Sequence, residues 1–583
     1  MVRMLSTLAA ALFVAAVSAL PASPVEVAER AVCTNSATSR DCWTDGFDIN
    51  TNFYLETPDT GVEREYWLSV EETDCAPDGV VRKCQTLNGT IPGPLLTADW
   101  GDTLTIHVIN NLSDNGTSVH WHGIRQLNSS EMDGVPGVTQ CPIAPGDTMT
   151  YSYRLRQYGS TWYHSHFTFQ LAEGVFGPLV INGPASANYD EDLGLLFLQD
   201  WSHTPILELW GRSPGNPFTL DNLLINGTNT FTDADGVTTG SKHEVVVEKG
   251  KTYRMRVINV AVDGFFDFHI DGHNFTVIAT DLVPVQPFQV ESIQIGIGQR
   301  YDIVFTADAD EDNYWIRSGW NTNCQAIGNN GDVSGNGTAI LRYDASSTAD
   351  PTTEDTVGIM STCFDEDRTH LVPILNVNVT NLSEIVVQDL GLTTAIKGYL
   401  TWTLNTSTLY LDWLEPSLKQ VHDHNTSYFQ EENIVSVGDG FAADDWVVLV
   451  IDTSTIGVNH PMHLHGHDFF ILGQAANTAY PGPADFNFDN PTRRDVAVLP
   501  ANGYLAIAFQ LDNPGTWLVH CHIAWHTGEG LAMQFVESAD AALTSGALAN
   551  WDNAAWDGYG AGTCSNWADY VGVEVWPQDD SGI

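Results

Sequence analysis

Basic side chains are scarce in this 583-residue chain. Lysine and arginine number 23 against 73 aspartates and glutamates, which leaves a formal net charge of −50. Phosphate backbones and anionic lipid surfaces attract basic patches, so this charge argues against nucleic acid and against a membrane as partners. The excess of acid is typical of a protein that stays soluble in an acidic extracellular medium.

Long apolar runs are also missing, except at the amino terminus. There Arg3 precedes an apolar run over residues 5–20, and Val17-Ser18-Ala19 forms a small-residue cleavage pattern. The run is short for a membrane span, and no later stretch reaches the roughly 18 apolar residues that a span needs. We therefore predict a secreted, extracellular protein whose signal peptide and short propeptide cover residues 1–30 and end at Glu29-Arg30.

The composition does not suit a disordered chain either, because 43% of the residues are hydrophobic and 10% are aromatic. A chain of this length exceeds one hydrophobic core and predicts three or four domains. Fifty glycines and 26 prolines separate short stretches rich in Val, Ile, Thr and Tyr, which favours strands and turns.

Nine cysteines are present, and setting Cys521 aside leaves an even number that suits four disulfides in a secreted chain. Spacing alone does not choose among the many possible pairings. The candidate pairs are Cys33–Cys42, Cys75–Cys84, Cys324–Cys363 and Cys141–Cys564. Eleven Asn-x-Ser/Thr sequons agree with secretion. They lie at Asn88, Asn111, Asn115, Asn128, Asn226, Asn274, Asn336, Asn378, Asn381, Asn405 and Asn425.

A weak internal repeat relates the first and last thirds of the chain. The segment from Pro145 to His166 and the segment from Pro500 to His522 both contain a turn, a strand, a Thr-Trp pair and a His-x-His strand. The repeat predicts that the first and last domains are copies of one β-sandwich. The middle third has strand patterns but no histidine cluster, and we interpret it as a structural spacer.

Eight of the nineteen histidines form four His-x-His pairs in strand-like segments, whereas His422 and His424 form another apparent pair in a polar stretch that we interpret as a solvated loop. Alternation along a strand places both imidazoles of a pair on one face. A single pair can be incidental, but four pairs, two in each repeated domain, indicate a metal cluster. Eight imidazoles suit copper, whereas zinc favours one tetrahedral site with fewer ligands. The pairs are His120/His122, His164/His166, His463/His465 and His520/His522.

Cys521 lies between the two histidines of the last pair. On a strand its thiol points away from both imidazoles, so a second metal site is expected on the opposite face. One thiolate with imidazoles is the ligand set of a blue-copper site, and His526 and His460 are the natural partners. We interpret His467, in the same segment, as a structural residue rather than a ligand.

These segments resemble the four signature segments of the multicopper oxidases. They read His-Trp-His-Gly at 120, His-Ser-His at 164, His-Pro-Met-His-Leu-His-Gly-His at 460 and His-Cys-His-Ile-Ala-Trp-His at 520. The start at Cys42 and the Asp-Ser-Gly-Ile end at 580 are similar to the laccases of ascomycete fungi. The resemblance implies an all-β chain of three consecutive cupredoxin-like Greek-key β-sandwich domains, over residues 31–186, 187–367 and 368–583.

The resemblance also implies four copper ions, namely one type 1, one type 2 and two type 3. The type 1 copper takes His460, Cys521 and His526, and the type 2 copper takes His120 and His463. The type 3 coppers take His122, His164 and His522 in one case, and His166, His465 and His520 in the other.

Leu531 stands ten residues after the cysteine, where blue-copper sites often carry a weak axial methionine. Leucine cannot donate to copper, so we predict a high potential for the type 1 site and interpret Met533 as core packing. The resemblance places a substrate-pocket carboxylate at Asp263, which would accept the phenolic proton, and an acid near the trinuclear cluster at Asp133. Turn geometry is the alternative explanation for both aspartates.

The carboxy terminus resembles the cleaved end of ascomycete relatives. Asp-Ser-Gly-hydrophobic marks their cleavage site, and this chain ends at Ile583, so we expect a plug in the solvent channel that needs no cleavage. A frayed terminus is the alternative. Ala524 replaces an acid of many basidiomycete relatives, so one proton path of the family is absent.

The function implied is that of a secreted laccase, which oxidises small phenols or aromatic amines and reduces O2 to water. The alternatives are another multicopper oxidase, either an ascorbate oxidase or a ferroxidase, and a catalytically silent cupredoxin array that binds partners. A silent array would have lost ligands, and this chain keeps all ten histidines and the cysteine. We expect a monomer or a weakly associated dimer.

Overall fold

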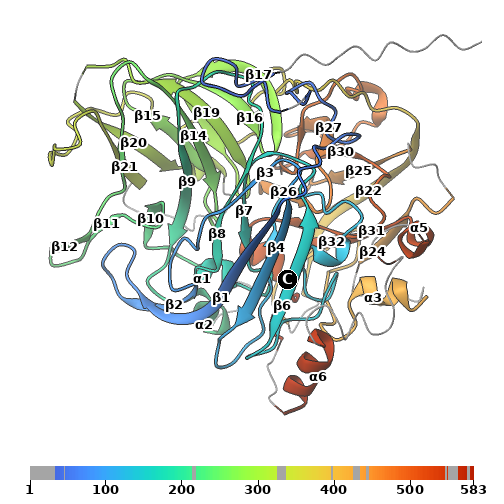
Figure 1. Cartoon of the computed structure of the whole chain (residues 1–583). Helices are drawn as coiled ribbons and strands as arrows, with labels where there is room; N and C mark the ends of the chain where they lie inside the picture. The colour runs from blue at the N-terminus through green and yellow to red at the C-terminus, as the bar shows by residue number, and fades with distance from the viewer. Residues whose placement is uncertain are drawn as a thin grey trace, which may run out of the picture.

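A computed structural model describes residues 33–44, 46–212, 218–310, 312–324, 337–394, 398–424, 433–440, 445–544, 548, 562–573 and 578–583 (Figure 1). The expected signal peptide and propeptide, and the sequons at Asn336 and Asn425, lie outside these residues. Strands dominate the described part, and three pairs of sheets follow one another along the chain. The predicted all-β architecture of three consecutive sandwiches is confirmed.

The first pair of sheets lies between residues 63 and 182. Its first sheet has the order β2 (Arg82–Leu87), β1 (Glu63–Cys75), β4 (Thr103–Asn110) and β6 (Thr148–Arg154). Its second sheet has the order β3 (Leu96–Asp99), β8 (Phe176–Asn182), β7 (Gly159–His164) and β5 (His120–Trp121). Alternate residues of β4, such as Leu104 and Ile106, are fully buried against β7 and β8, which makes the two sheets one core.

The second pair lies between residues 191 and 342. One sheet runs β10 (Asn222–Ile225), β9 (Glu191–Trp201), β14 (Thr252–Asn259), β19 (Arg300–Thr306), β16 (Phe275–Thr280) and β17 (Val283–Val290). The other runs β13 (Glu244–Val246), β21 (Gly337–Arg342), β20 (Asn313–Trp320), β15 (Phe266–Ile270) and β18 (Ser292–Ile295). A short hairpin joins β11 (Thr230–Thr232) to β12 (Thr238–Gly240).

The third pair lies between residues 382 and 537. One sheet runs β23 (Thr401–Leu404), β22 (Leu382–Thr393), β25 (Trp446–Asp452), β30 (Tyr504–Gln510), β27 (Phe469–Ala475) and β28 (Arg493–Arg494). The other runs β24 (Ile434–Val437), β32 (Ala532–Glu537), β31 (Gly515–Cys521), β26 (His460–Leu464) and β29 (Val496–Leu499).

The first and third sandwiches repeat one topology. In the first, β3 pairs in parallel with β8, β8 pairs antiparallel with β7, and β7 pairs antiparallel with the short histidine strand β5. In the third, β24 pairs in parallel with β32, β32 pairs antiparallel with β31, and β31 pairs antiparallel with the short histidine strand β26. The register places His120 opposite His164 in the first sandwich and His463 opposite His520 in the third. The predicted internal repeat is therefore present in the strand pairing itself.

Short helices and four disulfides complete the fold. The disulfides are the four candidate pairs, and Cys521 is a free, buried thiol. Cys141–Cys564 ties the first sandwich to the last helix. The helices are α1 (Gln170–Glu173), α2 (Ile206–Arg212), α3 (Ser417–His422), α4 (Ala524–Gly528), α5 (Ala539–Thr544) and α6 (Thr563–Val573), and the 3-10 turns are η1 (Ser130–Met132), η2 (Thr322–Cys324) and η4 (Pro483–Asp485).

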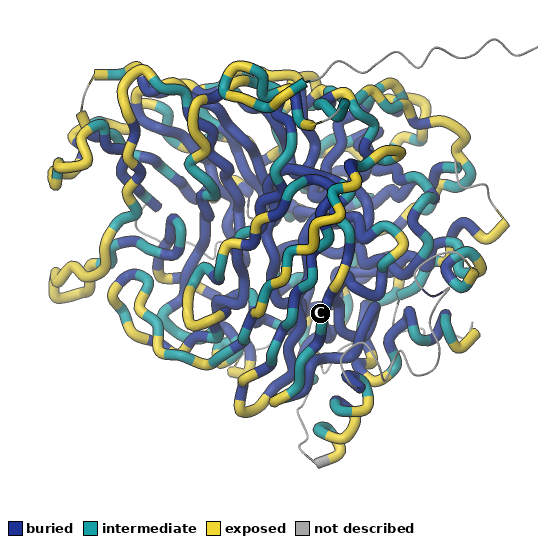
Figure 2. The backbone as a smooth tube through the Cα atoms, in the orientation of Figure 1, coloured by how far each residue is buried: buried dark blue, intermediate teal, exposed yellow. Residues whose placement is uncertain are grey.

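Burial follows the sheets. Figure 2 shows buried backbone running through the interior of the strands, while exposed segments gather at the loops and at the edges. The strand β25 is buried along six of its seven residues, as its unbroken apolar sequence requires. Among the helices that the structure describes, none combines the length and the apolar character needed to cross a membrane.

Candidate metal centre

Eight histidines meet where the first and third sandwiches contact each other. Each His-x-His pair lies on, or directly after, one of four short strands, β5, β7, β26 and β31, so the strand register fixes the positions of the rings. None of the eight side chains is more than 4% exposed. The predicted histidines that the structure brings together here are His120, His122, His164, His166, His463, His465, His520 and His522.

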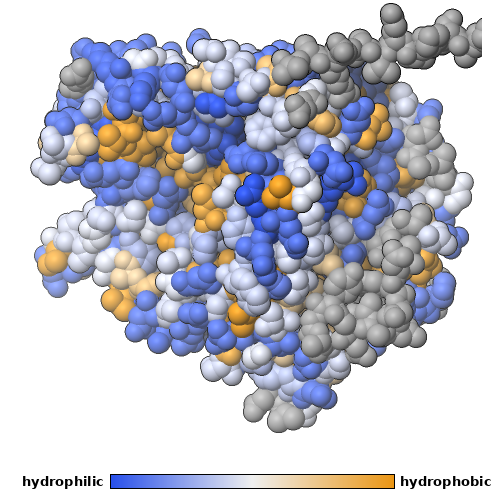
Figure 3. All heavy atoms as spheres, in the orientation of Figure 1, coloured by the Kyte–Doolittle hydropathy of each residue, from blue (hydrophilic) through white to orange (hydrophobic). Residues whose placement is uncertain are grey.

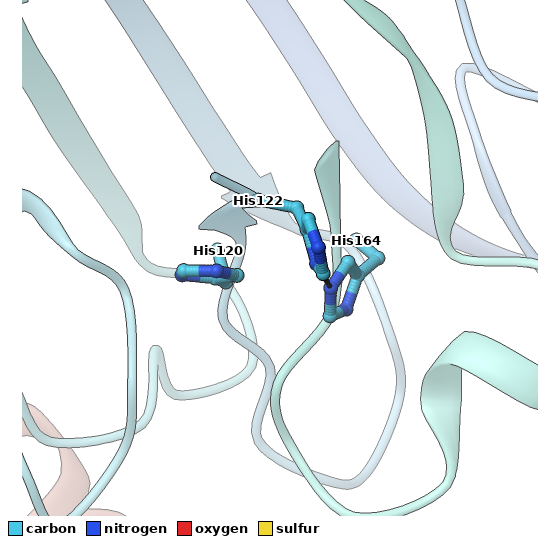
Figure 4. Close-up of side chains that lie close together, drawn as sticks. All are labelled: His120, His122 and His164. Atoms are coloured by element: carbon cyan, nitrogen blue, oxygen red, sulfur yellow. Dashed lines mark hydrogen bonds between the residues drawn. The ribbon is translucent and has the colours of Figure 1, made fainter. Parts of the chain in front are cut away.

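One side of this cluster contains His120, His122 and His164, whose ring nitrogens lie within 4.8 Å of one another. Figure 4 shows the three rings, and the dashed line marks the 3.4 Å approach of His164 Nε2 to His122 Nδ1. The ring of His522 lies 5.1 Å from that of His122 and 5.6 Å from that of His164. His463 stacks on His122 at 4.0 Å.

The other side contains His166, His465 and His520, which also form a group within 4.8 Å. His465 Nε2 lies 3.2 Å from His520 Nε2, and the ring of His166 lies 5.1 Å from each of their rings. His120 and His463 face each other across the cluster with ring centroids 5.9 Å apart.

The hydrogen bonds on the outer side of the rings fix the tautomers. A carbonyl oxygen only accepts, so His520 Nδ1 must donate to the carbonyl of Cys521, and His164 Nδ1 to that of Ser165. His465 Nδ1 likewise donates to the carboxylate of Asp133 at 2.8 Å. Their Nε2 atoms then carry lone pairs that point into the cluster.

These lone pairs face each other without a proton between them. His465 Nε2 meets His520 Nε2, and His164 Nε2 meets His122 Nδ1, because His122 Nε2 donates to Asp495 at 3.1 Å. Two facing lone pairs repel unless a cation lies between them. Burial lowers the pKa of His122, His164 and His465 well below its ordinary value, so the rings themselves stay neutral. The donor set therefore fits a metal cluster.

A second group lies on the opposite face of β31. Cys521 Sγ is 3.6 Å from His460 Nδ1 and 3.6 Å from His526 Nδ1, and the two nitrogens are 3.1 Å apart. Metal bonds of about 2.0–2.3 Å to nitrogen and sulfur match one ion held among these atoms. Burial raises the pKa of the Cys521 thiol well above its ordinary value, so a bound cation is needed to hold it as a thiolate.

Leu531 lies directly beside this group. Its carbonyl accepts from the backbone N–H of Cys521 at 3.0 Å, and its own N–H donates to the backbone carbonyl of His526 at 2.9 Å. Its side chain is fully buried. Met533 instead lies opposite Val519 in the register of β31 and β32 and is buried in the core. His526 is partly exposed whereas His460 is buried, so the accessible edge of the group is His526.

Asp263 lies in a loop that contacts the same group. The carboxylate of Asp200 accepts three consecutive backbone N–H groups, from Val262, Asp263 and Gly264, at 2.8–2.9 Å. Val262 in turn accepts from the backbone of Ala524, the first residue of α4, which carries His526. Asp263 is 6% exposed, and the negative charge of its carboxylate adds to the effect of burial, which raises the pKa of the Cys521 thiol.

Asp133 contacts the histidine cluster through two kinds of atoms. Its carboxylate lies 2.8 Å from His465 Nδ1 and 3.2 Å from His120 Nδ1, and its carbonyl accepts from His120 Nδ1 at 2.8 Å. The turn also matters, because the φ of +84° at Gly134 suits glycine and a Cβ there would meet the carbonyl of Val119. Asp133 therefore serves both the turn and the ligand orientation.

The interpretation of the middle third as a spacer is wrong. Arg300, at the start of β19, forms a paired hydrogen bond with Asp495 at 2.5 and 2.6 Å, and Asp495 accepts from His122. Burial raises the pKa of Asp495 to about 7, against the opposing effect of the Arg300 guanidinium. Gly298 approaches the cluster so closely that a Cβ would lie 2.9 Å from the ring of His522.

Sequence reasoning missed Arg300, Asp495 and Gly298. The available signal was Arg493-Arg494-Asp495, a charged triplet at the start of an apolar strand in a chain with few basic residues. Arg493, Arg494 and Asp495 are all buried, and charged side chains are rarely buried without a specific partner. His467, by contrast, hydrogen-bonds Glu537 at 2.9 Å and stays outside the cluster, in agreement with the structural interpretation.

The carboxy terminus is docked rather than frayed. Ser581 Oγ donates to the carbonyl of Thr527, and the carbonyl of Gly582 accepts from Trp413 Nε1. Ile583 is 4% exposed and lines a cavity of about 40 Å³ together with His164, His166, His520 and His522. That cavity has room for one or two water molecules beside the cluster.

Comparisons with known proteins show the family to which the chain is similar. Models of the multicopper oxidase family match residues 69–186, 192–346 and 408–541. Laccase-2 of Botryotinia fuckeliana is 52% identical over 584 aligned residues, which cover 98% of this chain and 97% of that protein. The crystal structure of the laccase from Botrytis aclada is 52% identical, covers 94% of this chain and 100% of its own, and superposes with a TM-score of 0.87.

A more distant structure shares the fold alone. Fet3p, a multicopper oxidase that functions in iron import, is 24% identical over 89% of this chain and 96% of its own, with a TM-score of 0.75. The three sandwiches are accordingly cupredoxin-like, as the sequence predicted.

Proposed function

The chain belongs to the multicopper oxidases, and from this premise we propose that it is a laccase. It couples one-electron oxidations of small phenols and aromatic amines to the four-electron reduction of O2 to water. The observation that carries the proposal is the strand that ends in His520-Cys521-His522. Its thiol lies in the Cys521 group, and its two imidazoles lie in the eight-histidine cluster.

The proposal includes four copper ions. His460, Cys521 and His526 hold the type 1 ion, and His120 and His463 hold the type 2 ion. One type 3 ion belongs to His122, His164 and His522, and the other to His166, His465 and His520. Copper bound at these positions supplies reversible one-electron redox chemistry.

The chain's own residues set the path of electrons and protons. The covalent backbone from Cys521 to its two neighbouring histidines joins the two ligand groups, so electrons need not cross a packed gap. Asp263, held by Asp200 beside α4, accepts the proton of a phenol bound against the accessible edge of His526. Asp133, in contact with His465 and His120, orients water or supplies protons near the place of oxygen reduction.

The tail and the solvent are part of the same proposal. Residues 580–583 plug the approach to the cluster, since Ile583 lines its cavity and Ser581 is bonded to α4. Substrates are expected at the Cys521 side and O2 at the cluster side. The protein is secreted, acts on small molecules, and works as a monomer or a weakly associated dimer.

Steady-state oxygen uptake tests the proposal. A phenol, an aromatic amine, ascorbate and ferrous iron are supplied in turn to the copper-loaded protein, and the absorption spectrum is recorded for the blue band of type 1 copper. We expect uptake with the phenol and the amine. Uptake with ascorbate or iron alone would make it a different oxidase, and a colourless protein without uptake would make it a silent cupredoxin array.

A further inference from the structure

Trp67 is a large apolar side chain left open to solvent on the outer face of the first sandwich. It is 56% exposed, and it is the one tryptophan among the exposed large hydrophobic side chains of the described residues. In the parallel pairing of β1 with β4 it lies opposite His107, and the two rings stack at 4.0 Å with an interplanar angle of 24°. The imidazole therefore covers one face of the indole, and more than half of the tryptophan stays open to solvent.

The surroundings of this indole are polar. Glu65 hydrogen-bonds the far nitrogen of His107, and Thr105 bonds both Glu63 and Ser152. Where β1, β4 and β6 face the viewer in Figure 3, hydrophilic and neutral side chains prevail. A flat aromatic face ringed by hydroxyl and carboxylate groups is the chemistry that binds a sugar, whose C–H groups stack on the ring while its hydroxyls bond the rim.

A glycosylation sequon lies on the same face and within reach. Asn111 follows β4 directly, is exposed, and donates from Nδ2 to Ser69 Oγ at 2.6 Å. Ser69 is two residues after Trp67 on β1, so both side chains point outward, about 7 Å apart. Through its bond to Ser69, the Nδ2 atom of Asn111 thus lies on the same outward face of β1 as the indole.

We propose that Asn111 carries an N-linked glycan whose first N-acetylglucosamine residues stack on Trp67. The attachment replaces one hydrogen of Asn111 Nδ2 by a bond to the anomeric carbon of a lipid-diphosphate oligosaccharide, and the lipid diphosphate leaves with the proton. The second N–H remains and keeps its bond to Ser69. The proposal rests on the proposed secretion, which supplies the oligosaccharide donor.

A neighbouring sequon provides an internal contrast. Asn115 is only 2% exposed, its hydroxyl partner Thr117 is fully buried, and its backbone N–H donates to Tyr570. A glycan at Asn115 would not fit the folded chain, so this sequon stays unmodified. The sequon at Asn88 is exposed and lies beside the same strand, with Asn88 Nδ2 donating to the carbonyl of Trp67 at 3.0 Å, and it serves as the competing source of the sugar.

Hydroxyl-radical footprinting of the secreted protein tests the assignment. Ser113→Ala removes the sequon but leaves Asn111 and its bond to Ser69 in place, and Thr90→Ala is the matched variant for Asn88. We expect glycopeptide mass spectrometry to find sugar at Asn111 and none at Asn115. We expect oxidation of Trp67 to become several-fold faster in Ser113→Ala and to stay unchanged in Thr90→Ala.

A thermodynamic cycle gives a second readout. Trp67→Ala should lower the melting temperature of the glycosylated protein and have a smaller effect in the Ser113→Ala background, because the indole then has no sugar to hold. The assignment would be overturned if Asn111 carried no sugar, or if Trp67 were oxidised at the same rate in all variants. It would also be overturned if the oxidation of Trp67 became faster only in Thr90→Ala. Absence of sugar from every sequon would contradict secretion itself, whereas a sugar on Asn111 with an unprotected Trp67 would contradict the stacking alone.

Discussion

Gly298 offers a direct test of the part that the middle sandwich takes in the cluster. Its φ is +83°, and a Cβ built there lies 2.9 Å from His522 Cδ2 and 3.2 Å from His122 Cε1. Neither ring can turn away freely, because His122 is bonded to Asp495 and the buried ring of His522 is packed against the rings of His164 and His463. We expect Gly298→Ala to displace both imidazoles by a few tenths of an ångström.

The size of the effect has two parts. Alanine in the left-handed region costs about 1–2 kcal/mol wherever it occurs. The displaced rings add a loss at the metal site, and disturbed ligand orientation typically lowers metal affinity roughly 10–100-fold. The Cys521 group lies on the other face of β31 and makes no contact with Gly298, so its blue absorption band should persist.

Gly250→Ala is the matched control. Gly250 lies in a turn of the same sandwich with a φ of +89°, and a Cβ there meets nothing within 4 Å. Both variants should lose similar stability, while only Gly298→Ala should lose cluster copper and oxygen uptake, measured by metal analysis and steady-state kinetics. Equal copper content and equal uptake in the two variants would refute the close approach of the middle sandwich.

Three further predictions address single residues. Asp263→Asn should slow the oxidation of phenols roughly 10²-fold or more but leave the oxidation of proton-free one-electron donors nearly unchanged. Equal slowing of both oxidations would contradict the role of Asp263 as a base. Leu531→Met should lower the type 1 potential by adding a weak ligand, and a redox titration that shows no shift contradicts it. Burial raises the pKa of Glu131 to about 8, so the folded state favours its neutral form and loses stability as pH rises from about 4.5 to about 8. At roughly 1.4 kcal/mol per pH unit this reaches a few kcal/mol, and Glu131→Gln should flatten the fall of melting temperature across that range; a parallel fall in both proteins speaks against it.

The ligands could be predicted because their pattern is local. A His-x-His pair on a strand needs only the alternation of side chains to place both rings on one face, and Cys521 needs the same rule to point away from them. Cys33–Cys42 and Cys75–Cys84 were candidates because the members of each pair are close in sequence, although spacing alone did not choose among the pairings. Cys141–Cys564 was reachable only by elimination, since 423 residues separate its ends.

The partners of the ligands could not be predicted in the same way. Arg300 and Asp495 are 195 residues apart and meet only because the middle sandwich packs against the cluster. Nothing in the pattern around Gly298 distinguishes it from the many other glycines at turns. The close approach of Gly298 to the ring of His522 is a property of the tertiary packing, so the sequence pattern does not show it. For this reason the interpretation of the middle third as a spacer failed.

The two metal groups differ in what must fold before they form. His460, Cys521 and His526 all belong to the third sandwich, so that sandwich alone brings them together. The eight-histidine cluster takes four rings from the first sandwich and four from the third, and the middle sandwich presses Gly298 and Arg300 against it. The Cys521 group is therefore built within one domain, whereas the eight-histidine cluster requires all three sandwiches to be assembled. The strand that ends at Cys521 carries members of both groups, so their connection is covalent, while the cluster itself depends on packing between domains.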